Sequence, residues 1–293
     1  MPEPIGEAWL TGSECRFADG LFAGKMLGEV WPRISNDWAG SARRDRPFPV
    51  LVKFLFPEDK LSVQVHPDDD YAKRHEAVAG GIGKTEMWYV ISARPGAEVR
   101  VGLKPHVTRE IFRSAIAAGN AEEMLERIAV RAGDAIFIPA GTVHTIGPGM
   151  VLCEVQQNSD LTYRVYDFKR RDAAGRPREL HLEKAFEVIR FGKQCGGRAS
   201  QSQNDAGGIL LAECDYFRVT KHLIRDSCAF RAGGQMQIAV IVQGSGAIRL
   251  GSEQKRLDYA PAQAWLIPAA LEEYCLEPRD ATTALFISVP SAN

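Results

Sequence analysis

Short apolar runs separated by short polar segments make up most of this chain. Each run is about four to eight residues long and is bounded by glycine, proline, aspartate or serine, which is typical of β-strands. Many short strands at this spacing favour a barrel or a sandwich, so the pattern predicts a mainly β protein. The runs cover residues 49–56, 61–65, 87–91, 135–138, 151–155, 164–168, 217–223, 238–242, 264–267 and 284–289.

Three stretches depart from the strand pattern and have the setting or the spacing of helices. They cover residues 70–79, 108–129 and 182–190. The second is long enough for a pair of helices, with Gly119-Asn120 as the break. We therefore expect a few helices added to a β scaffold.

A polar, glycine-rich stretch at residues 192–208 has the composition of a linker. We place the domain boundary within it, which predicts one domain over residues 1–196 and a second over residues 197–293. A chain of 293 residues is long enough for two such compact units.

Composition narrows the classes of function. Lysine and arginine total 36 against 37 aspartates and glutamates, a net charge of -1, so no overall field attracts nucleic acid or an acidic membrane. The N-terminus lacks the features of a signal peptide, and no apolar run reaches the roughly 18 residues of a membrane span. The six cysteines form no CxxC pair, which argues against a zinc ribbon or a redox motif. We expect a cytoplasmic protein that acts on small molecules.

Two imidazoles, a carboxylate and an amide stand on or beside short predicted strands. Gln64 and His66 are two residues apart, so their side chains leave one strand on the same face. Glu86 begins another strand, and His144 follows a Pro-Ala-Gly turn. These are ligand types of zinc, although either histidine alone is more often an ordinary partly buried or surface residue. No HExxH helix is present, so a metal site here has to be assembled across strands.

The second predicted domain repeats part of the first. The segment AGDAIFIPA at 132–140 resembles PAQAWLIPA at 261–269, and on that register His144 falls opposite Glu273. Residues 237–242 similarly resemble residues 86–91, but they have no carboxylate at the position of Glu86. The repeat predicts a duplicated small barrel with one metal site and one empty copy.

Lys84 lies two residues before Glu86, in a Gly-Lys-Thr sequence that ends like a phosphate-binding loop. That motif fails on spacing, because it requires a glycine at position 78, which is Val78, and because it opens a helix rather than a strand. Lys84 is therefore either a solvated loop cation or a charge beside the metal site.

Arg164 shares a strand face with Thr162 and Tyr166, a polar and aromatic surface that suits a sugar phosphate. The alternative is an arginine at the surface, paired with Asp160 or Asp167. The residues alone leave both interpretations open.

Four segments together resemble the signature of the type I phosphomannose isomerases, zinc enzymes of the cupin superfamily, and especially their short bacterial branch. The resemblance spans about residues 5 to 190, and a weaker segment, LHLEKA at 180–185, closes it. The segments are LSVQVHPDD at 61–69, GKTEMWYV at 83–90, AGDAIFIPAGTVHTI at 132–146 and QQNSDLTYRVYD at 156–167.

The resemblance implies a fold and a site. The fold would be two cupin-like β-barrels, or jelly rolls, with a few added helices, and the second barrel would be a degenerate copy. One Zn²⁺ per chain and an active-site arginine at Arg164 are implied, with the family's lysine falling on Lys84. The implied zinc ligands are Gln64, His66, Glu86 and His144. The large helical insertion of longer family members is missing, so its substrate contacts cannot be transferred.

The implied reaction interconverts mannose 6-phosphate and fructose 6-phosphate through an enediol. Zinc would stabilise the enediolate charge, and Arg164 suits an oxyanion because of its forked guanidinium. Lys84, a zinc-bound water and a nearby carboxylate all remain open as the proton-transfer base. The implied partner is a small sugar phosphate.

Two other classes of function compete. The first is a non-catalytic sugar-binding cupin that keeps a metal for stability, and the presence of Lys84 and Arg164 weighs against it. The second is a non-haem iron oxygenase with two histidines and one carboxylate, and Gln64 as a fourth ligand weighs against that.

Overall fold

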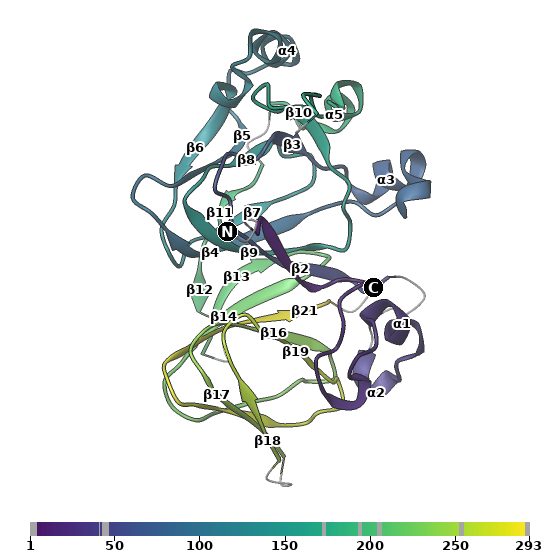
Figure 1. Ribbon diagram of the computed structural model, residues 1–293, viewed down its shortest axis with the longest axis vertical. Coiled ribbons are helices and arrows are strands. Elements are labelled where there is room, and N and C mark those ends of the chain that lie inside the picture. Colours follow the sequence, from purple (N-terminus) through teal and green to yellow (C-terminus); the bar gives the residue numbers. More distant parts are fainter. Residues whose placement is uncertain are drawn as a thin grey trace. The chain divides into compact units, whose positions relative to one another are not determined.

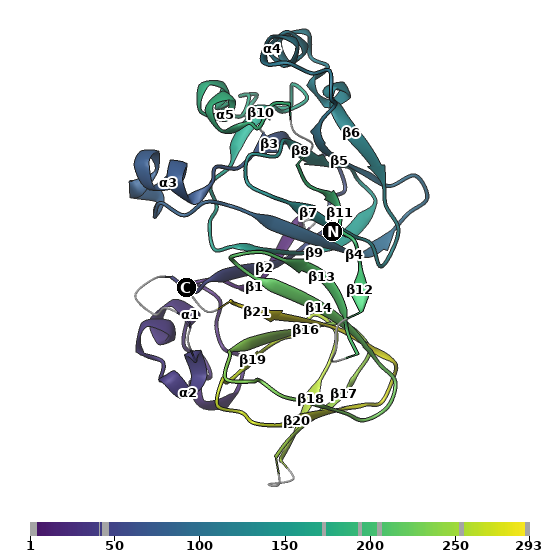
Figure 2. The same cartoon turned by 180° about the vertical axis from the view of Figure 1, so that it is seen from behind.

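The protein is described as a computed structural model, shown from two sides in Figures 1 and 2. The structure describes residues 5–40, 42, 47–171, 174–192, 195–203, 207–251 and 255–290. The chain forms two compact units. The first holds Met1–Ala8 and Lys53–Ala199, and the second holds Trp9–Val52 and Ser200–Asn293.

The division after Ala199 lies three residues beyond the boundary placed at residue 196, but residues 9–52 group with the second unit rather than with the first. Backbone hydrogen bonds explain this grouping. Ala269 and Ala270 donate to the carbonyls of Trp38 and Asp37 at 3.1 and 2.7 Å. Because this N-terminal stretch has no long apolar strand of its own, nothing in its sequence pattern pointed to those distant partners.

Two antiparallel sheets contain the strands of the first unit, and the division of the chain falls within β1 and β2. One has the order β1-β2-β9-β4-β7-β11 and the other the order β10-β3-β8-β5-β6. The strands of the first sheet are β1 (Glu7–Thr11), β2 (Val50–Leu55), β9 (Met150–Gln157), β4 (Glu86–Ala93), β7 (Ala135–Ile138) and β11 (Gly197–Arg198). The strands of the second sheet are β10 (Tyr163–Tyr166), β3 (Val63–Val65), β8 (His144–Ile146), β5 (Glu98–Leu103) and β6 (Leu125–Ala129).

The two sheets face each other across an apolar core. Trp88 and Leu152 from the first sheet and Val101 and Ile146 from the second belong to one buried cluster. Side chains alternate along a strand, so neighbouring residues of the second sheet project to opposite faces. One of each pair faces this core side, and the other faces the outer side.

Helices cover the outer side of β3 and β10, as the upper part of Figure 1 shows. Val63 and Val65 pack there against Phe112 and Phe186, so Gln64 between them must face the opposite sheet. The helices are α3 (Asp69–His75), α4 (Arg109–Ala118) and α5 (Leu182–Val188), with a short 3-10 turn, η4 (Ala121–Met124), after α4.

The prediction of a helix pair over residues 108–129 was wrong in its second half. After Gly119, whose φ is +83°, one short 3-10 turn leads into strand β6. Leu125 and Ile128 lie opposite Leu103 and Val99 of β5. The segment pairs with the edge of β5 although its local spacing suits a helix equally well. Pairing with a distant strand thus outweighs the local helical preference.

The second unit contains two further antiparallel sheets, of order β12-β13-β14-β21-β16-β19 and β15-β20-β17-β18. Its core includes Ile241, Tyr259, Tyr274 and Phe286. The strands are β12 (Ser202–Gln203), β13 (Ile209–Glu213), β14 (Arg218–Ile224), β21 (Thr282–Ser288), β16 (Gln237–Gln243), β19 (Ala264–Ile267), β15 (Cys228–Phe230), β20 (Tyr274–Pro278), β17 (Gly246–Leu250) and β18 (Lys255–Tyr259). Short helices α1 (Leu27–Val30) and α2 (Asn36–Ala39) precede them.

Strand pairing bears on the predicted repeat. In the first unit Glu86 lies opposite Ile138, and in the second Gln237 lies opposite Ile267. That is the register on which the two sequences were aligned. The position of the carboxylate in the first unit is therefore an amide in the second, where Gln237 accepts a hydrogen bond of 2.9 Å from the Tyr274 hydroxyl.

No helix in the described ranges is long and apolar enough to cross a membrane.

Gly83 lies where the approach to β4 meets the start of α3. Its backbone N–H donates to Asp69 Oδ1 at 2.8 Å, and Asp68 caps the helix by accepting from Tyr71 N at 2.9 Å. A Cβ on Gly83 would lie 2.5 Å from the Asp68 carbonyl carbon and 2.6 Å from Asp69 N. Only glycine lets the chain pass this close to the helix and enter β4 in its observed position.

Gly83→Ala should therefore lower the free energy of unfolding by about 1–3 kcal/mol, because the clashing atoms are backbone and cannot swing aside. Chemical denaturation of metal-free protein measures this loss. The control is Gly6→Ala, where nothing lies within 4 Å of the added Cβ; it should change the free energy by less than about 0.5 kcal/mol. Equal stabilities of the two variants would contradict the proposed close approach.

Candidate functional site

Three of the predicted site residues come together through strand register. Gln64 on β3 has His144 of β8 as one cross-strand neighbour and Arg164 of β10 as the other. Directly opposed residues of antiparallel strands project from the same face. The Gln64 amide nitrogen lies 3.2 Å from His144 Nε2. His66, two residues beyond Gln64, extends the same face just past the end of β3.

The remaining candidate ligand comes from the opposing sheet. Glu86 opens β4 and is completely buried. Its Oε1 lies 3.3 Å from His144 Nε2, and its Oε2 lies 3.6 Å from His66 Nε2. One ligand atom from each of these three residues falls within 4.8 Å of the others. The site is thus assembled across two sheets, as the absence of a metal-binding helix motif had indicated.

Hydrogen bonds orient both imidazoles. His66 Nδ1 lies 2.8 Å from the Leu161 carbonyl, and His144 Nδ1 lies 2.9 Å from the Thr142 carbonyl. A carbonyl only accepts, so each Nδ1 carries the proton and each Nε2 presents a lone pair. Both Nε2 atoms lie within 3.6 Å of a Glu86 carboxylate oxygen. In metal sites, a hydrogen bond from the ring nitrogen that does not bind the metal orients the histidine ligand in the same way.

The site has unsatisfied buried atoms that fit a cation. His66 Nε2 and Glu86 Oε1 have no hydrogen-bond partner in the part of the chain that the structure describes, and Glu86 Oε2 meets only the Lys84 ammonium at 3.2 Å and His66 Nε2 at 3.6 Å. Buried polar atoms are seldom left in this state. Two neutral nitrogens and a carboxylate are also the donor set of many zinc sites. Gln64 completes the set only if its amide is turned, so that oxygen rather than nitrogen faces inward; such a turn exchanges two ends of equal size.

Burial controls the charges of these ligands. It raises the pKa of Glu86 to about 7, against the opposing effect of Lys84. It lowers the pKa of His144 to about 4, and it lowers that of His66 well below its usual value, with Lys84 and His144 adding to the effect. Both imidazoles are therefore neutral at neutral pH, which is the form that binds metals.

Lys84 is a buried partner of the site rather than a solvated loop cation. It is 5% exposed, and its Nζ lies 3.2 Å from Glu86 Oε2. Burial by itself lowers the pKa of Lys84, but the carboxylates of Glu86 and Glu154 outweigh it and leave the pKa above its usual value. Lys84 thus carries a positive charge next to the candidate metal ligands.

Sequence reasoning did not single out a second buried ion pair behind the site. Glu154 Oε1 accepts a hydrogen bond of 3.0 Å from Trp88 Nε1, and Lys53 Nζ lies 3.6 Å from Glu154 Oε2. The Trp88 ring in turn meets the His144 ring edge-on, with centroids 5.4 Å apart. The available signal was a lysine and a glutamate inside otherwise apolar strands, at positions where a charge is costly without a partner.

Arg164 reaches away from the predicted acidic partners. Its Nη1 donates to the Glu179 carbonyl at 2.9 Å, and its buried Nε has no partner among the residues the structure describes. Asp167 is engaged with Arg170 and Arg178 instead. Arg164 is thus a partly buried cation, on the face of the sheet that also carries Gln64.

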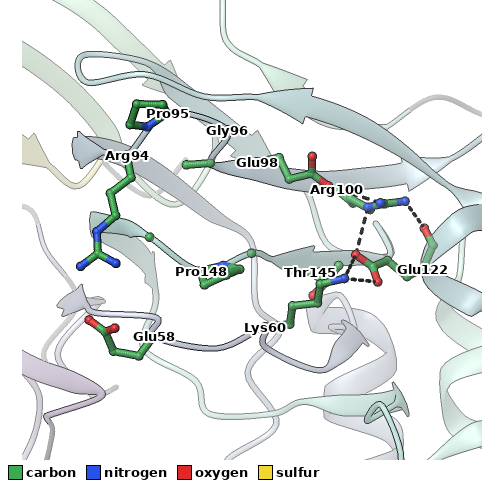
Figure 3. A pocket seen from close by; sticks show the side chains of 13 residues that line it. Glu58, Lys60, Arg94, Pro95, Gly96, Glu98, Arg100, Glu122, Thr145 and Pro148 are labelled. Atoms are coloured by element: carbon green, nitrogen blue, oxygen red, sulfur yellow. Dashed lines mark hydrogen bonds and ion pairs between the residues drawn. The ribbon is translucent and has the colours of Figure 1, made fainter.

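A separate hollow of about 490 Å³ lies among β5, β8 and their neighbouring loops (Figure 3). It contains none of the predicted ligands. Lys60 and Arg100 both bind Glu122 there, with Lys60 Nζ 2.8 Å from Glu122 Oε2. Its central charges satisfy one another, so we place the functional site at the buried histidines.

Comparison with known proteins tests the family resemblance. No family model matches the chain. Over 260 residues the chain is 38% identical to a mannose-6-phosphate isomerase of Streptococcus mutans, which covers 87% of this chain and 80% of that protein. The chain belongs to the mannose-6-phosphate isomerase family. A second member, mannose-6-phosphate isomerase ManA of Bacillus subtilis, is 36% identical over 279 residues, or 93% of this chain and 86% of that protein. The predicted family resemblance is thus confirmed.

A crystal structure of mannose 6-phosphate isomerase from Bacillus subtilis has the same fold, with a TM-score of 0.86 and 31% identity over 97% of this chain and 89% of that one. A variant of phosphomannose isomerase from Salmonella typhimurium, at 15% identity and a TM-score of 0.77 over 99% of this chain and 92% of that one, shares the fold. The chain thus has the architecture of isomerases in this family over nearly its whole length.

The raised pKa of Glu86 can be measured directly. In metal-free protein, the ¹³C shift of the Glu86 carboxyl should titrate with a midpoint near 7. Saturating zinc should abolish that titration, because a bound cation keeps the carboxylate ionised. Since Lys84 lowers this pKa, Lys84→Met should move the midpoint above 7. A midpoint below 7 in the variant would refute the charge coupling.

Proposed function

We propose that this protein is a zinc-dependent aldose-ketose isomerase that interconverts mannose 6-phosphate and fructose 6-phosphate through an enediol. The observation that carries the proposal is the buried His66, Glu86 and His144 set, with unsatisfied ligand atoms and the cations Lys84 and Arg164 beside it. Membership of a family named for this reaction supports the same conclusion.

His66, Glu86 and His144 would hold the zinc ion, with Gln64 as a fourth ligand once its amide oxygen faces inward. When bound, zinc would supply Lewis acidity toward the oxygens on C1 and C2 of the open-chain sugar, a contribution of several kcal/mol in comparable enzymes. The carbonyls of Leu161 and Thr142 would keep both imidazoles in the ligand tautomer.

Lys84 and Arg164 would have different electrostatic roles. The raised pKa of Lys84 keeps it protonated, so we assign it as a hydrogen-bond donor to the oxyanion of the enediolate rather than as the base. Arg164 presents a guanidinium fork on the same sheet face as Gln64, where it can bind an anionic substrate group. Both charges lie where desolvation strengthens them.

We also infer that the two units are cupin-like jelly rolls and that the second is a degenerate copy. The matching registers of Glu86 with Ile138 and of Gln237 with Ile267 support this. The second unit would then have a structural role, since an amide bonded to Tyr274 replaces the ligand carboxylate.

Two substitutions separate metal binding from catalysis. His144→Ala should lose zinc and activity together, because it removes a ligand. Arg164→Ala should keep about one zinc per chain and lose about 100-fold or more in turnover, the usual effect of removing one charge-stabilising donor. Metal analysis and a coupled assay of mannose 6-phosphate conversion, before and after chelation, measure both effects.

The control is Arg94→Ala, since Arg94 is an exposed arginine of the same unit outside the site; it should retain both metal and activity. Full zinc occupancy in His144→Ala would refute the ligand assignment. Zinc without turnover in the unaltered protein would favour a sugar-binding cupin, and bound iron with oxygen uptake would favour an oxygenase.

A further inference from the structure

Two more arginines gather beyond Arg164, where β10 ends in an unusual turn. Phe168 and Lys169 adopt φ values of 54° and 58°, the left-handed region that side chains other than glycine rarely occupy. Strained backbone of this kind persists where surrounding contacts hold it, often at functional sites. The turn places Asp167 between Arg170 and Arg178.

Asp167 is 4% exposed and receives both guanidinium groups. Arg178 Nε donates to Asp167 Oδ2 at 2.8 Å, and Arg178 Nη2 donates to Oδ1. Arg170 also donates to Oδ1, and its Nη1 donates to the carbonyl of Lys60. Arg178 is thus held by a two-point contact that fixes the plane of its guanidinium.

The segment that carries Arg178 runs beside Arg164. The His181 N–H donates to the Arg164 carbonyl at 2.8 Å, and Arg164 Nη1 donates to the Glu179 carbonyl at 2.9 Å. The Arg164 backbone N–H also lies 3.2 Å from His181 Nδ1. These contacts bring residues 178–181 against the strand that is paired with Gln64.

The cluster has more positive charge than its own carboxylate neutralises. Three guanidinium groups, those of Arg164, Arg170 and Arg178, gather around the buried Asp167 carboxylate, and the exposed Asp59 carboxylate lies 3.9 Å from Arg170 Nη1, so the cluster keeps an excess of positive charge. Arg178 uses Nε and Nη2 on Asp167, and its Nη1 has no hydrogen-bond partner within the described ranges. A phosphate monoester with a charge of about -1.5 to -2 at neutral pH matches that excess.

We propose that Arg178 is a phosphate-binding guanidinium of the substrate site, near Arg164, and that Asp167 is the positioning residue that aims it. The proposal rests on the proposed function, since it assigns a binding role for the phosphate of that substrate. In this arrangement the sugar end reaches toward the metal ligands near Gln64, and the phosphate lies outward along the face of β10.

The simpler alternative is that the Asp167 ion pairs only fasten the turn. Exposed ion pairs contribute little to stability, and the Arg178 side chain is 46% exposed. A structural role predicts a loss of thermal stability without a selective change in KM. A phosphate-binding role predicts weaker binding of every phosphate ligand, with kcat nearly unchanged.

The experiment compares Arg178→Gln with the unaltered zinc-loaded protein. We expect KM for mannose 6-phosphate and the inhibition constant of inorganic phosphate to rise together by about tenfold, the usual scale for losing a charged hydrogen bond. The kcat should stay within about twofold, and zinc content should stay unchanged. Arg178→Lys, which keeps the charge but loses the two-point contact, should recover part of the affinity.

Asp167→Asn should raise both constants as well, since it releases Arg178. The matched control is Arg171→Gln, because Arg171 is an exposed arginine of the same turn whose Nη1 donates to the Gly175 carbonyl. It should leave KM and the inhibition constant unchanged.

Two results would overturn the proposal: unchanged KM and inhibition constant in a folded Arg178→Gln protein, or an equal effect in Arg171→Gln. If Arg178→Gln unfolds, the same constants measured on Arg178→Lys decide, and unchanged values again overturn the proposal. Phosphate binding followed by ³¹P NMR is independent of turnover. If the unaltered protein binds phosphate through Arg178 but converts no mannose 6-phosphate, the proposed function fails while the anion site stands.

Discussion

A carboxylate buried at the meeting point of two sheets is the constraint on which the rest of the first unit depends. Glu86 has no exposed surface, and its oxygens lie beside the Lys84 ammonium and the two imidazoles. An uncompensated buried charge costs several kcal/mol, so the group must take up a proton, pair with a cation or bind a metal. Its raised pKa, the ion pair with Lys84 and the two facing imidazoles are three aspects of this one requirement.

The charges around that carboxylate form layers. Lys84 lies against Glu86, and the Lys53–Glu154 pair lies behind it, linked to His144 through the Trp88 ring. Each layer is acceptable in an apolar core only because the next one compensates it. Removing a single partner therefore disturbs the ligands without touching them, which is why residues outside the ligand set belong to the site.

The second unit shows a matching strand register without that requirement. At the position matching Glu86 it carries Gln237, a neutral group satisfied by Tyr274. Aromatic rings pack close by: the rings of Phe230 and Tyr274 are stacked, with their centroids 5.7 Å apart. Since no charge needs compensation at that position, no neighbouring cation is needed, and burial there serves packing alone.

The alternation of side chains along short strands was enough to identify the mainly β class and the ligand candidates. Gln64 and His66 had to share a face, and a polar pair inside an apolar strand stands out without any partner being known. A domain boundary was likewise predicted from the glycine-rich composition of residues 192–208. These features are local, because they depend on the few residues next to each position.

Only the tertiary structure decided the features that depend on distant pairing. Residues 125–129 have helical spacing but form a strand, because the edge of β5 offers hydrogen bonds. Residues 9–52 join the second unit through backbone contacts that leave no trace in composition. The partners of Lys53, Glu154 and Arg178 could not be predicted for the same reason. The role of a charged side chain depends on the groups within a few ångströms of it, and only the fold brings those groups together.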